Sequence, residues 1–313
     1  MRLLRDAIAT VATKRFPGAL PFLAEKHARQ ATHVAVSGRH IDIIRNADRA
    51  TIRISRANAV YVPDLINSFE YYFNSVISRD GIVDFSSPRP QHIVGFDDFP
   101  IVCPSLAEPF VTTQQYLDAA QLPAGGIVLD LGAYSGLTSI AFAKAVGPTG
   151  RVIALEPDPI NHAAARANIS TYETTTGTSN IHLVQMAVAG STGTMALSSE
   201  GAMGSAAASV VGRYRGNTVP IPACTLADLA ARFDLPKVDF IKMDIEGSEE
   251  PVLAASEDFF RLYRPKLVIE PHLVNKALSD VAVRAVLSRF GYRCETIEQT
   301  GVSLPLVVAS PLH

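Results

Sequence analysis

A strand, a turn of small residues and a helix follow one another within residues 126–146. Residues 127–131 are an apolar run interrupted only by Asp130, which is typical of a strand buried in a parallel sheet. The apolar run 137–146 that follows the turn predicts a helix that stops at a Gly-Pro pair. Glycines let a ligand approach the backbone, and the first N–H groups of a helix are free to bind it. This order predicts the ligand-binding edge of a doubly wound α/β sheet. The small residues of the turn are Gly132, Ala133 and Gly136.

From about residue 111, predicted strands and helices alternate in a regular order. Residues 292–297 and 303–309 then predict a closing antiparallel hairpin. A dinucleotide dehydrogenase would complete a sixth parallel strand, whereas a terminal hairpin is typical of S-adenosylmethionine-dependent methyltransferases. Residues 194–197 and 218–221 could pair as a smaller hairpin. The predicted parallel strands are 127–131, 151–156, 181–186, 238–244 and 266–270.

Residues 1–110 contain no motif that indicates a chemistry. Alternating residues around a polar turn predict a hairpin within 41–55. An apolar stripe of period 3.6 predicts a helix over 64–77. Residues 84–110 are rich in proline and predict an irregular connector. We therefore expect an α+β accessory or cap region, residues 1–110, ahead of a catalytic domain, residues 111–313.

The composition limits the partners and the cellular compartments that can be expected for the chain. The formal net charge of −2 gives no bias toward nucleic acid, although residues 1–56 hold eleven Lys/Arg against four Asp/Glu. Three widely spaced cysteines without a C-x-x-C pair argue against a disulfide framework or a zinc site and indicate a reducing compartment. Charges interrupt the N-terminal apolar residues, and no apolar run is long enough to span a bilayer. We expect a cytoplasmic protein without stable membrane insertion and without a nucleic-acid partner.

The turn differs from the dinucleotide fingerprint G-x-G-x-x-G, because Tyr134 stands where the second glycine would be. That glycine lets a pyrophosphate lie on the backbone, so its absence favours a nucleoside cofactor without a diphosphate. Asp130 could bind the ammonium group of such a ligand. Glu156, at the end of the second strand, could accept both ribose hydroxyls. NAD would use the same carboxylate, so Glu156 alone does not choose between the cofactors.

A second group of polar residues follows the fourth and fifth strands. Asp244 and Glu246 lie at the carboxyl end of strand 238–244, and Glu270 and His272 lie at the carboxyl end of strand 266–270. The ends of parallel strands meet at the ligand-binding edge. These groups could therefore position a substrate hydroxyl, accept its proton or hold a metal.

Glu249 and Glu250 fall in the first turn of a predicted helix. Attraction between their charges and the helix dipole accounts for acidic residues at these two positions.

Four segments in this order resemble the FkbM family of S-adenosylmethionine-dependent methyltransferases. They are V-L-D-L-G-A-Y-S-G, A-L-E-P-D-P, M-A-V-A-G and V-D-F-I-K-M-D-I-E-G-S-E. The resemblance covers about residues 111–313. It implies a class I methyltransferase fold, with a Rossmann-like α/β sheet of parallel strands and a C-terminal antiparallel hairpin.

The resemblance also implies S-adenosylmethionine as the cofactor and assigns the residues around it. Asp244 and Glu246 would face the reacting centre, and Ala187 and Val188 would flank the adenine. Tyr134 departs from the family, which more often has asparagine there. The residues expected to hold the rest of the cofactor are Asp130, Gly132, Ala133, Tyr134, Gly136, Glu156 and Pro157.

The expected reaction is displacement at the sulfonium methyl by a hydroxyl oxygen of a sugar, a polyketide or another secondary metabolite. His272 is the first candidate for the base, because its unperturbed pKa lies near neutrality. Asp244 and Glu246 complete the expected catalytic set. A metal held by Asp244, Glu246 and Glu270 is an alternative, but none is assigned.

Two alternative functions remain at this point. An NAD-dependent oxidoreductase would also use the acidic residue that ends the second strand. A non-catalytic module with a methyltransferase-like fold would bind a partner through the basic N-terminal region. Residues 1–110 could equally serve as a homodimer contact.

Overall fold

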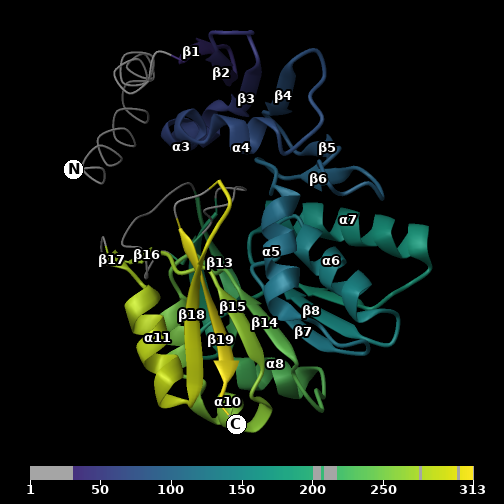
Figure 1. The fold of residues 1–313 in the computed structure, drawn as a ribbon, viewed down its shortest axis with the longest axis vertical. Coiled ribbons are helices and arrows are strands. Elements are labelled where there is room, and N and C mark those ends of the chain that lie inside the picture. The colour runs from purple at the N-terminus through teal and green to yellow at the C-terminus, as the bar shows by residue number, and fades with distance from the viewer. Residues whose placement is uncertain (1–30, 200–205, 208–216, 275–276, 302–303, 313) are drawn as a thin grey trace. The chain divides into compact units, whose positions relative to one another are not determined.

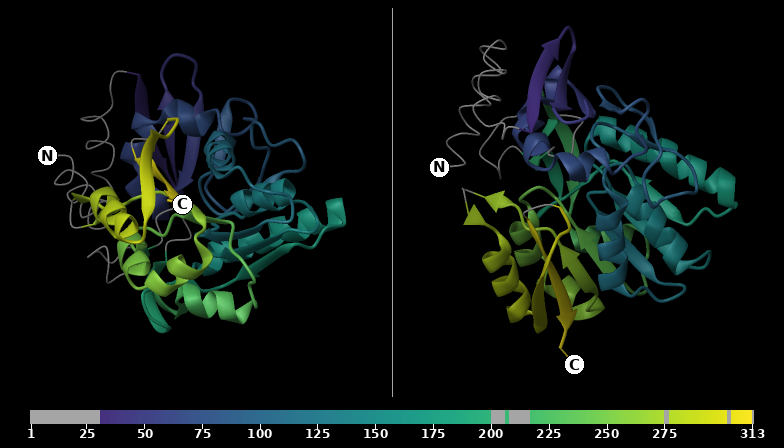
Figure 2. Two further views of the ribbon diagram at one scale, coloured as in Figure 1. Left: turned by 60° about the horizontal axis from the view of Figure 1, so that its bottom comes forward. Right: turned by 45° about the horizontal axis from the view of Figure 1, so that its top comes forward.

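The computed structural model describes residues 31–199, 206–207, 217–274, 277–301 and 304–312. The chain divides into two compact units, residues 1–110 and 111–313. Figure 1 shows the elements of both units, and Figure 2 gives two further views. Among the helices in the described ranges, none has the length and apolarity needed to cross a membrane.

The first unit contains a four-stranded sheet in the order β1-β2-β3-β4. The predicted hairpin within residues 41–55 is confirmed as the antiparallel pair β2–β3, in which Ile41 faces Ile54 and Ile43 faces Ile52. All four isoleucines are fully buried, so the alternating pattern gives one apolar face. β4 joins β3 in parallel. The strands are β1 (Thr32–Ser37), β2 (His40–Arg45), β3 (Thr51–Ser55) and β4 (Ile82–Phe85).

The single helix predicted over 64–77 is wrong. The chain forms a 3-10 helix and then two short helices, which are separated at Ser68 by a non-helical backbone (φ −120°, ψ 37°). The Arg45 guanidinium lies over the Phe69 and Phe73 rings of the second helix, at 5.3 and 5.4 Å from their centroids. The apolar periodicity of the sequence carries no information about this contact with β2. The three elements are η2 (Arg56–Tyr61), α3 (Val62–Asn67) and α4 (Phe69–Phe73).

The predicted connector over 84–110 is also more ordered than expected. Besides β4, it contains the antiparallel pair of β5 (Arg89–Gln91) and β6 (Ile101–Cys103). Strands of three residues are too short to give a clear alternation, so the prolines dominated the prediction.

In the described residues of the second unit, seven strands form one sheet in the order β18-β19-β15-β14-β7-β8-β9. In this order, the five strands from β15 to β9 are parallel to one another, and β19 is antiparallel to both of its neighbours. The predicted parallel sheet and closing hairpin are therefore confirmed. The strands are β7 (Ile127–Leu131), β8 (Arg151–Leu155), β9 (Ile181–Val184), β14 (Phe240–Met243), β15 (Lys266–Ile269), β18 (Tyr292–Glu298) and β19 (Pro305–Pro311).

Helices cover both faces of this sheet (Figure 1). Leu129 and Leu131 of β7 belong to an apolar core with residues from α8 to α11. Asp130, between them, points to the opposite face, where it accepts hydrogen bonds from Thr138 and Ser139 of α6. The helices are α5 (Phe110–Ala120), α6 (Leu137–Val146), α7 (Pro159–Thr176), α8 (Leu226–Arg232), α9 (Glu249–Ala254), α10 (Glu257–Tyr263) and α11 (Asp280–Arg289).

A smaller sheet lies between β9 and α8 in the sequence. Its main pair is β11 with β13, in which Leu197 faces Val219, so the predicted hairpin is confirmed. The short strand β16 (Leu273–Val274) pairs separately with β17 (Ala277–Leu278). The strands of the smaller sheet are β10 (Ala187–Val188), β11 (Gly193–Ser199), β12 (Ala206–Ala207) and β13 (Asn217–Cys224).

Candidate active site

The strand order reverses between β7 and β14. From β7 the chain continues to β8 on one side, while β14 continues to β15 on the other side. Crevices at such a reversal, at the carboxyl ends of the strands, are where open α/β sheets bind ligands. The first residues after these four strands are Gly132, Glu156, Asp244 and Glu270.

Gly132 lies where the ends of β7 and β14 approach each other too closely for a side chain. A Cβ atom built on it would lie 1.9 Å from the carbonyl oxygen of Asp244, and its φ is +90°. Its N–H donates to the Leu155 carbonyl of β8 at 3.0 Å. Only glycine fits this position, because both the neighbouring backbone and the dihedral exclude a side chain.

Glu156 connects the end of β8 to the turn after β7. One carboxylate oxygen accepts the Tyr134 N–H at 2.8 Å, and the other accepts the Asp158 N–H at 2.9 Å. The residue is only 4% exposed. Burial raises the pKa of Glu156 to about 8, although the two N–H bonds oppose this shift. Each oxygen keeps further acceptor capacity for hydroxyl donors.

Tyr134 has the left-handed conformation (φ +47°), which costs a non-glycine residue free energy. Its N–H bond to Glu156 holds the turn in this conformation. Asparagine tolerates this conformation better than tyrosine does.

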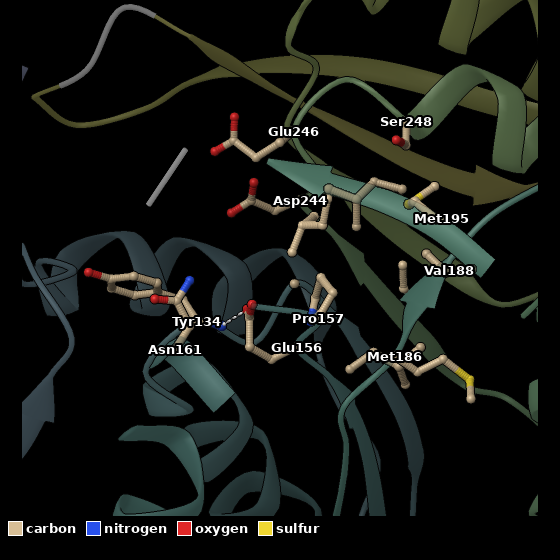
Figure 3. A pocket seen from close by; sticks show the side chains of 15 residues that line it. Tyr134, Glu156, Pro157, Asn161, Met186, Val188, Met195, Asp244, Glu246 and Ser248 are labelled. Atoms are coloured by element: carbon tan, nitrogen blue, oxygen red, sulfur yellow. Dashed lines mark hydrogen bonds between the residues drawn. The ribbon is translucent and has the colours of Figure 1, made fainter. Parts of the chain in front are cut away.

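Around these residues lies a pocket with about 620 Å³ of empty space, including open solvent at its mouth. Figure 3 shows Glu156 and Tyr134 in one part, Met186 and Val188 in another, and the carboxylates of Asp244 and Glu246 across from Glu156. The pocket therefore combines an apolar wall with acidic groups. The lining residues are Gly132, Tyr134, Leu155, Glu156, Pro157, Asn161, Met186, Ala187, Val188, Met195, Leu197, Asp244, Ile245, Glu246 and Ser248.

The structure brings most of the predicted cofactor residues to this pocket, but not all of them. Asp130, Ala133 and Gly136 do not line it. Asp130 is fully buried, and its carboxylate accepts hydrogen bonds from Thr138 and Ser139 at 2.9 and 2.5 Å. Burial raises the pKa of Asp130, and the nearby ammonium group of Lys242 opposes this shift.

Lys242 is a buried cation beneath the pocket that the sequence analysis missed. Its side chain is 1% exposed. The ammonium group donates to the Gly132 carbonyl at 2.7 Å and to Asp244 at 3.2 Å, and it lies 3.8 Å from Asp130. Lys242 therefore links the ends of β7 and β14. The sequence did contain a signal for this buried cation, because a single lysine interrupts an apolar strand between two acidic positions.

The predicted catalytic residues converge at the acidic end of the site. The Nε2 atom of His272 lies 3.5 Å from Asp244, 3.8 Å from Glu246 and 3.9 Å from Glu270. Its Nδ1 atom lies 2.8 Å from the Glu249 carboxylate. One atom each of Asp244, Glu246 and His272 lie within 4.8 Å of one another, so these three groups could share a cation.

The close carboxylates shift the protonation of this cluster. Burial lowers the pKa of His272, but Glu246, Glu249 and Asp244 outweigh it and hold that pKa well above its ordinary value. Burial raises the pKa of Glu246 to about 8, and the neighbouring carboxylates add to the shift. The cluster therefore favours a positive charge in its centre.

Sequence reasoning also missed the apolar residues that β11 contributes to the pocket, Met195 and Leu197. Their strand was expected, but its position over the sheet edge depends on tertiary packing. Glu249 was assigned to the helix dipole, and this account is incomplete because the residue is fully buried against His272.

The sheet order, with an antiparallel strand inserted beside the fifth parallel strand and a pocket at the reversal, defines the class I methyltransferase fold. Residues 130–294 match the model of the methyltransferase FkbM domain. This match covers more than half of the chain, so the chain belongs to the FkbM methyltransferase family. The predicted family and fold class are confirmed.

Solved structures similar to this chain are also methyltransferases. The methyltransferase FkbM from Methylobacillus flagellatus is 20% identical with a TM-score of 0.44, and the match covers 63% of this chain and 50% of that one. A SAM-dependent O-methyltransferase from Thermotoga maritima is 13% identical with a TM-score of 0.40, covering 64% of each chain. An O-methyltransferase from Bacillus cereus in complex with SAH is 14% identical with a TM-score of 0.39, covering 66% of this chain and 82% of that one. No curated protein matches this chain.

Proposed function

We propose that this protein transfers the methyl group of S-adenosylmethionine to a hydroxyl oxygen of a small-molecule acceptor, such as a sugar or a polyketide. The observation that carries the proposal is the pocket at the strand reversal. There a buried carboxylate, an apolar wall and an acidic end lie within one cavity. The FkbM family membership supports the methyl-transfer chemistry.

The residues of the pocket fit the three parts of the cofactor. Glu156 offers the acceptor atoms that a ribose diol requires. Met186, Ala187 and Val188 offer an apolar surface for a purine. Gly132 lines the pocket without a side chain of its own, so its backbone can lie close to the methionyl part.

When bound, S-adenosylmethionine supplies a methyl group that its sulfonium has already activated. The protein then has to exclude water, align the acceptor and take its proton. His272 is the proposed proton acceptor, with Asp244 and Glu246 orienting the hydroxyl at the edge of the pocket. The sulfonium of S-adenosylmethionine, bound beside these carboxylates, would compete with the imidazolium for their negative charge. This competition would lower the pKa of His272 and so favour the neutral ring that can accept a proton.

Calorimetric titration of the protein with S-adenosylmethionine, S-adenosylhomocysteine and NAD tests the proposed cofactor. We expect micromolar binding of the two sulfur nucleosides and no binding of NAD. Glu156→Ala removes the acceptors of the ribose hydroxyls, so binding should weaken about 100-fold. Glu295→Ala, in an exposed ion pair with Arg293, is the control and should bind normally. Binding of NAD alone would favour the oxidoreductase, and binding of no nucleotide would favour the partner-binding module.

The raised pKa of Glu156 predicts that S-adenosylhomocysteine binds more tightly as pH rises. The ribose hydroxyls need the ionised carboxylate, and the ligand-free protein holds a proton there up to about pH 8. The dissociation constant should fall about eightfold between pH 7 and pH 8.5. The unfolded chain already loses this proton near the ordinary pKa of glutamate. The same group therefore stabilises the ligand-free fold at low pH, and this contribution declines as pH rises toward 8.

The control for this pH dependence is Glu156→Gln, which cannot ionise. Its weaker affinity should show no such change between pH 7 and pH 8.5. An equal pH dependence in the wild type and the variant would assign the effect to another group.

The remaining proposals concern the surroundings of the reaction. The three cysteines, Cys103, Cys224 and Cys294, are free. A cytoplasmic location, a homodimer and an accessory or cap role for residues 1–110 stay predictions from the sequence.

A further inference from the structure

Glu249 is a buried carboxylate on which three donors converge. One of its oxygens, Oε1, accepts the N–H groups of Ile245 at 3.3 Å and Gly247 at 3.1 Å. The same oxygen lies 2.8 Å from Nδ1 of His272. The residue is completely buried, although it stands in the first turn of a six-residue helix. Attraction to a helix dipole does not require burial, so Glu249 has a more specific contact to make.

We propose that Glu249 is a positioning residue that fixes the orientation and the tautomer of His272 for proton transfer. This inference rests on the proposed function. An ionised carboxylate can only accept hydrogen bonds, so Nδ1 of the imidazole has to carry a proton. In the neutral ring, Nε2 then holds the lone pair. Carboxylates commonly orient functional histidines through the second ring nitrogen in this way.

The position of Nε2 determines why the tautomer matters for proton transfer. Nε2 faces oxygens of Asp244, Glu246 and Glu270 at 3.5–3.9 Å. Asp244 and Glu246 line the pocket and His272 does not, so Nε2 lies next to the acidic edge of the pocket, in contact with two of the carboxylates that form it. The opposite tautomer would place an N–H there, and the ring could not accept a proton from a hydroxyl.

The proton balance of the step follows from this geometry. As the acceptor oxygen forms its bond to the methyl carbon, the carbon–sulfur electron pair stays with sulfur. The hydroxyl proton passes to Nε2, and the imidazolium later releases it to water. Glu249 on one side of the ring and the three carboxylates on the other stabilise the positive charge.

A purely structural role for Glu249 is the competing explanation, because its bonds to Ile245 and Gly247 also support the turn between them. Glu246, inside this turn, has a left-handed conformation with φ +53°. The variant Glu249→Gln separates the two roles. Its amide oxygen can replace Oε1 as acceptor for the turn, but it carries no negative charge, so it holds Nδ1–H and the imidazolium more weakly than the carboxylate does.

The first test is nitrogen NMR of His272 in the complete protein bound to S-adenosylhomocysteine, at a pH where the ring is neutral. We expect the Nδ1–H tautomer in the wild type and a loss of this preference in Glu249→Met. The Nε2–H tautomer in the wild type would overturn the inference. Failure of the wild type to bind S-adenosylhomocysteine would instead overturn the proposed function, so the two failures are distinct.

The second test uses the acceptor that the wild type methylates in a screen of sugar and polyketide alcohols. Glu249→Gln should lower kcat about 10- to 100-fold and leave the KM for S-adenosylmethionine unchanged. In a His272→Ala background, the same substitution should have no further effect on kcat, because Glu249 acts through the ring. Glu250→Gln, the neighbouring residue on α9, is the matched control and should keep the wild-type kcat. An equal loss from Glu249→Gln in both backgrounds, or a parallel loss of cofactor affinity, would assign Glu249 a structural role only.

Discussion

Replacing Gly132 with alanine is expected to lower the free energy of unfolding by roughly 4 kcal/mol and to abolish binding of S-adenosylhomocysteine. The added methyl would lie 1.9 Å from the Asp244 carbonyl oxygen, so the ends of β7 and β14 would have to separate. They cannot move independently, because the Gly132 N–H bonds Leu155 and its carbonyl accepts from Lys242. Urea denaturation and calorimetric titration measure the two effects.

Gly177→Ala provides the matched control for this substitution. Gly177, which follows α7, has a left-handed conformation with φ +69° and ψ 13°, but a Cβ there would meet no atom within 4 Å. Only the conformational cost remains, roughly 1 kcal/mol, and ligand binding should be normal. Similar losses of stability in both variants would show that the contact with Asp244 is unimportant.

Lys242→Met is expected to lower the free energy of unfolding by roughly 3–5 kcal/mol, because it leaves Asp130 buried without its cation. The ammonium group also satisfies the Gly132 carbonyl and Asp244, and it lies 5.6 Å from the Tyr116 ring centroid. Methionine preserves most of the volume, so the loss is mainly electrostatic. Denaturant unfolding, followed by circular dichroism, measures it.

Two further variants test whether the loss of stability comes from the buried charge. Lys237→Met removes the ion pair of a half-exposed lysine with Asp239 and should cost less than about 1 kcal/mol. Adding Asp130→Asn to Lys242→Met removes the orphaned charge and should restore part of the stability. If Lys242→Met costs no more than Lys237→Met, the buried cation is not an important source of stability.

The parallel strands and the motif at the end of β7 could be predicted because their signals are local. An apolar run of five residues, two glycines and an acidic residue at the next strand end lie close together in the sequence. Glu156 could be predicted for the same reason, since a strand end places its side chain at the binding edge.

The relationships that could not be predicted join residues that are distant in the sequence. Lys242 reaches Gly132 across 110 positions, and Glu249 reaches His272 across 23 positions. The hydrogen bonds from the hydroxyls of α6 to the Asp130 carboxylate were not predicted either, and the contact of Asp130 with the ligand stays a prediction. In the first unit, the break at Ser68 was likewise not indicated by the helical periodicity of the sequence.

The position of β19 within the sheet has a consequence for the order in which the protein can be completed during synthesis. Val307, Val308 and Ala309 pair with β15, so β19, which is made after the other described strands, lies inside the sheet rather than at its edge. Until residues 305–311 leave the ribosome, β15 presents an unpaired row of backbone donors and acceptors. Exposed strand edges of this kind pair readily with other chains. A nascent chain stopped just short of β19 would therefore contain every residue that lines the pocket and still expose a strand edge that favours aggregation.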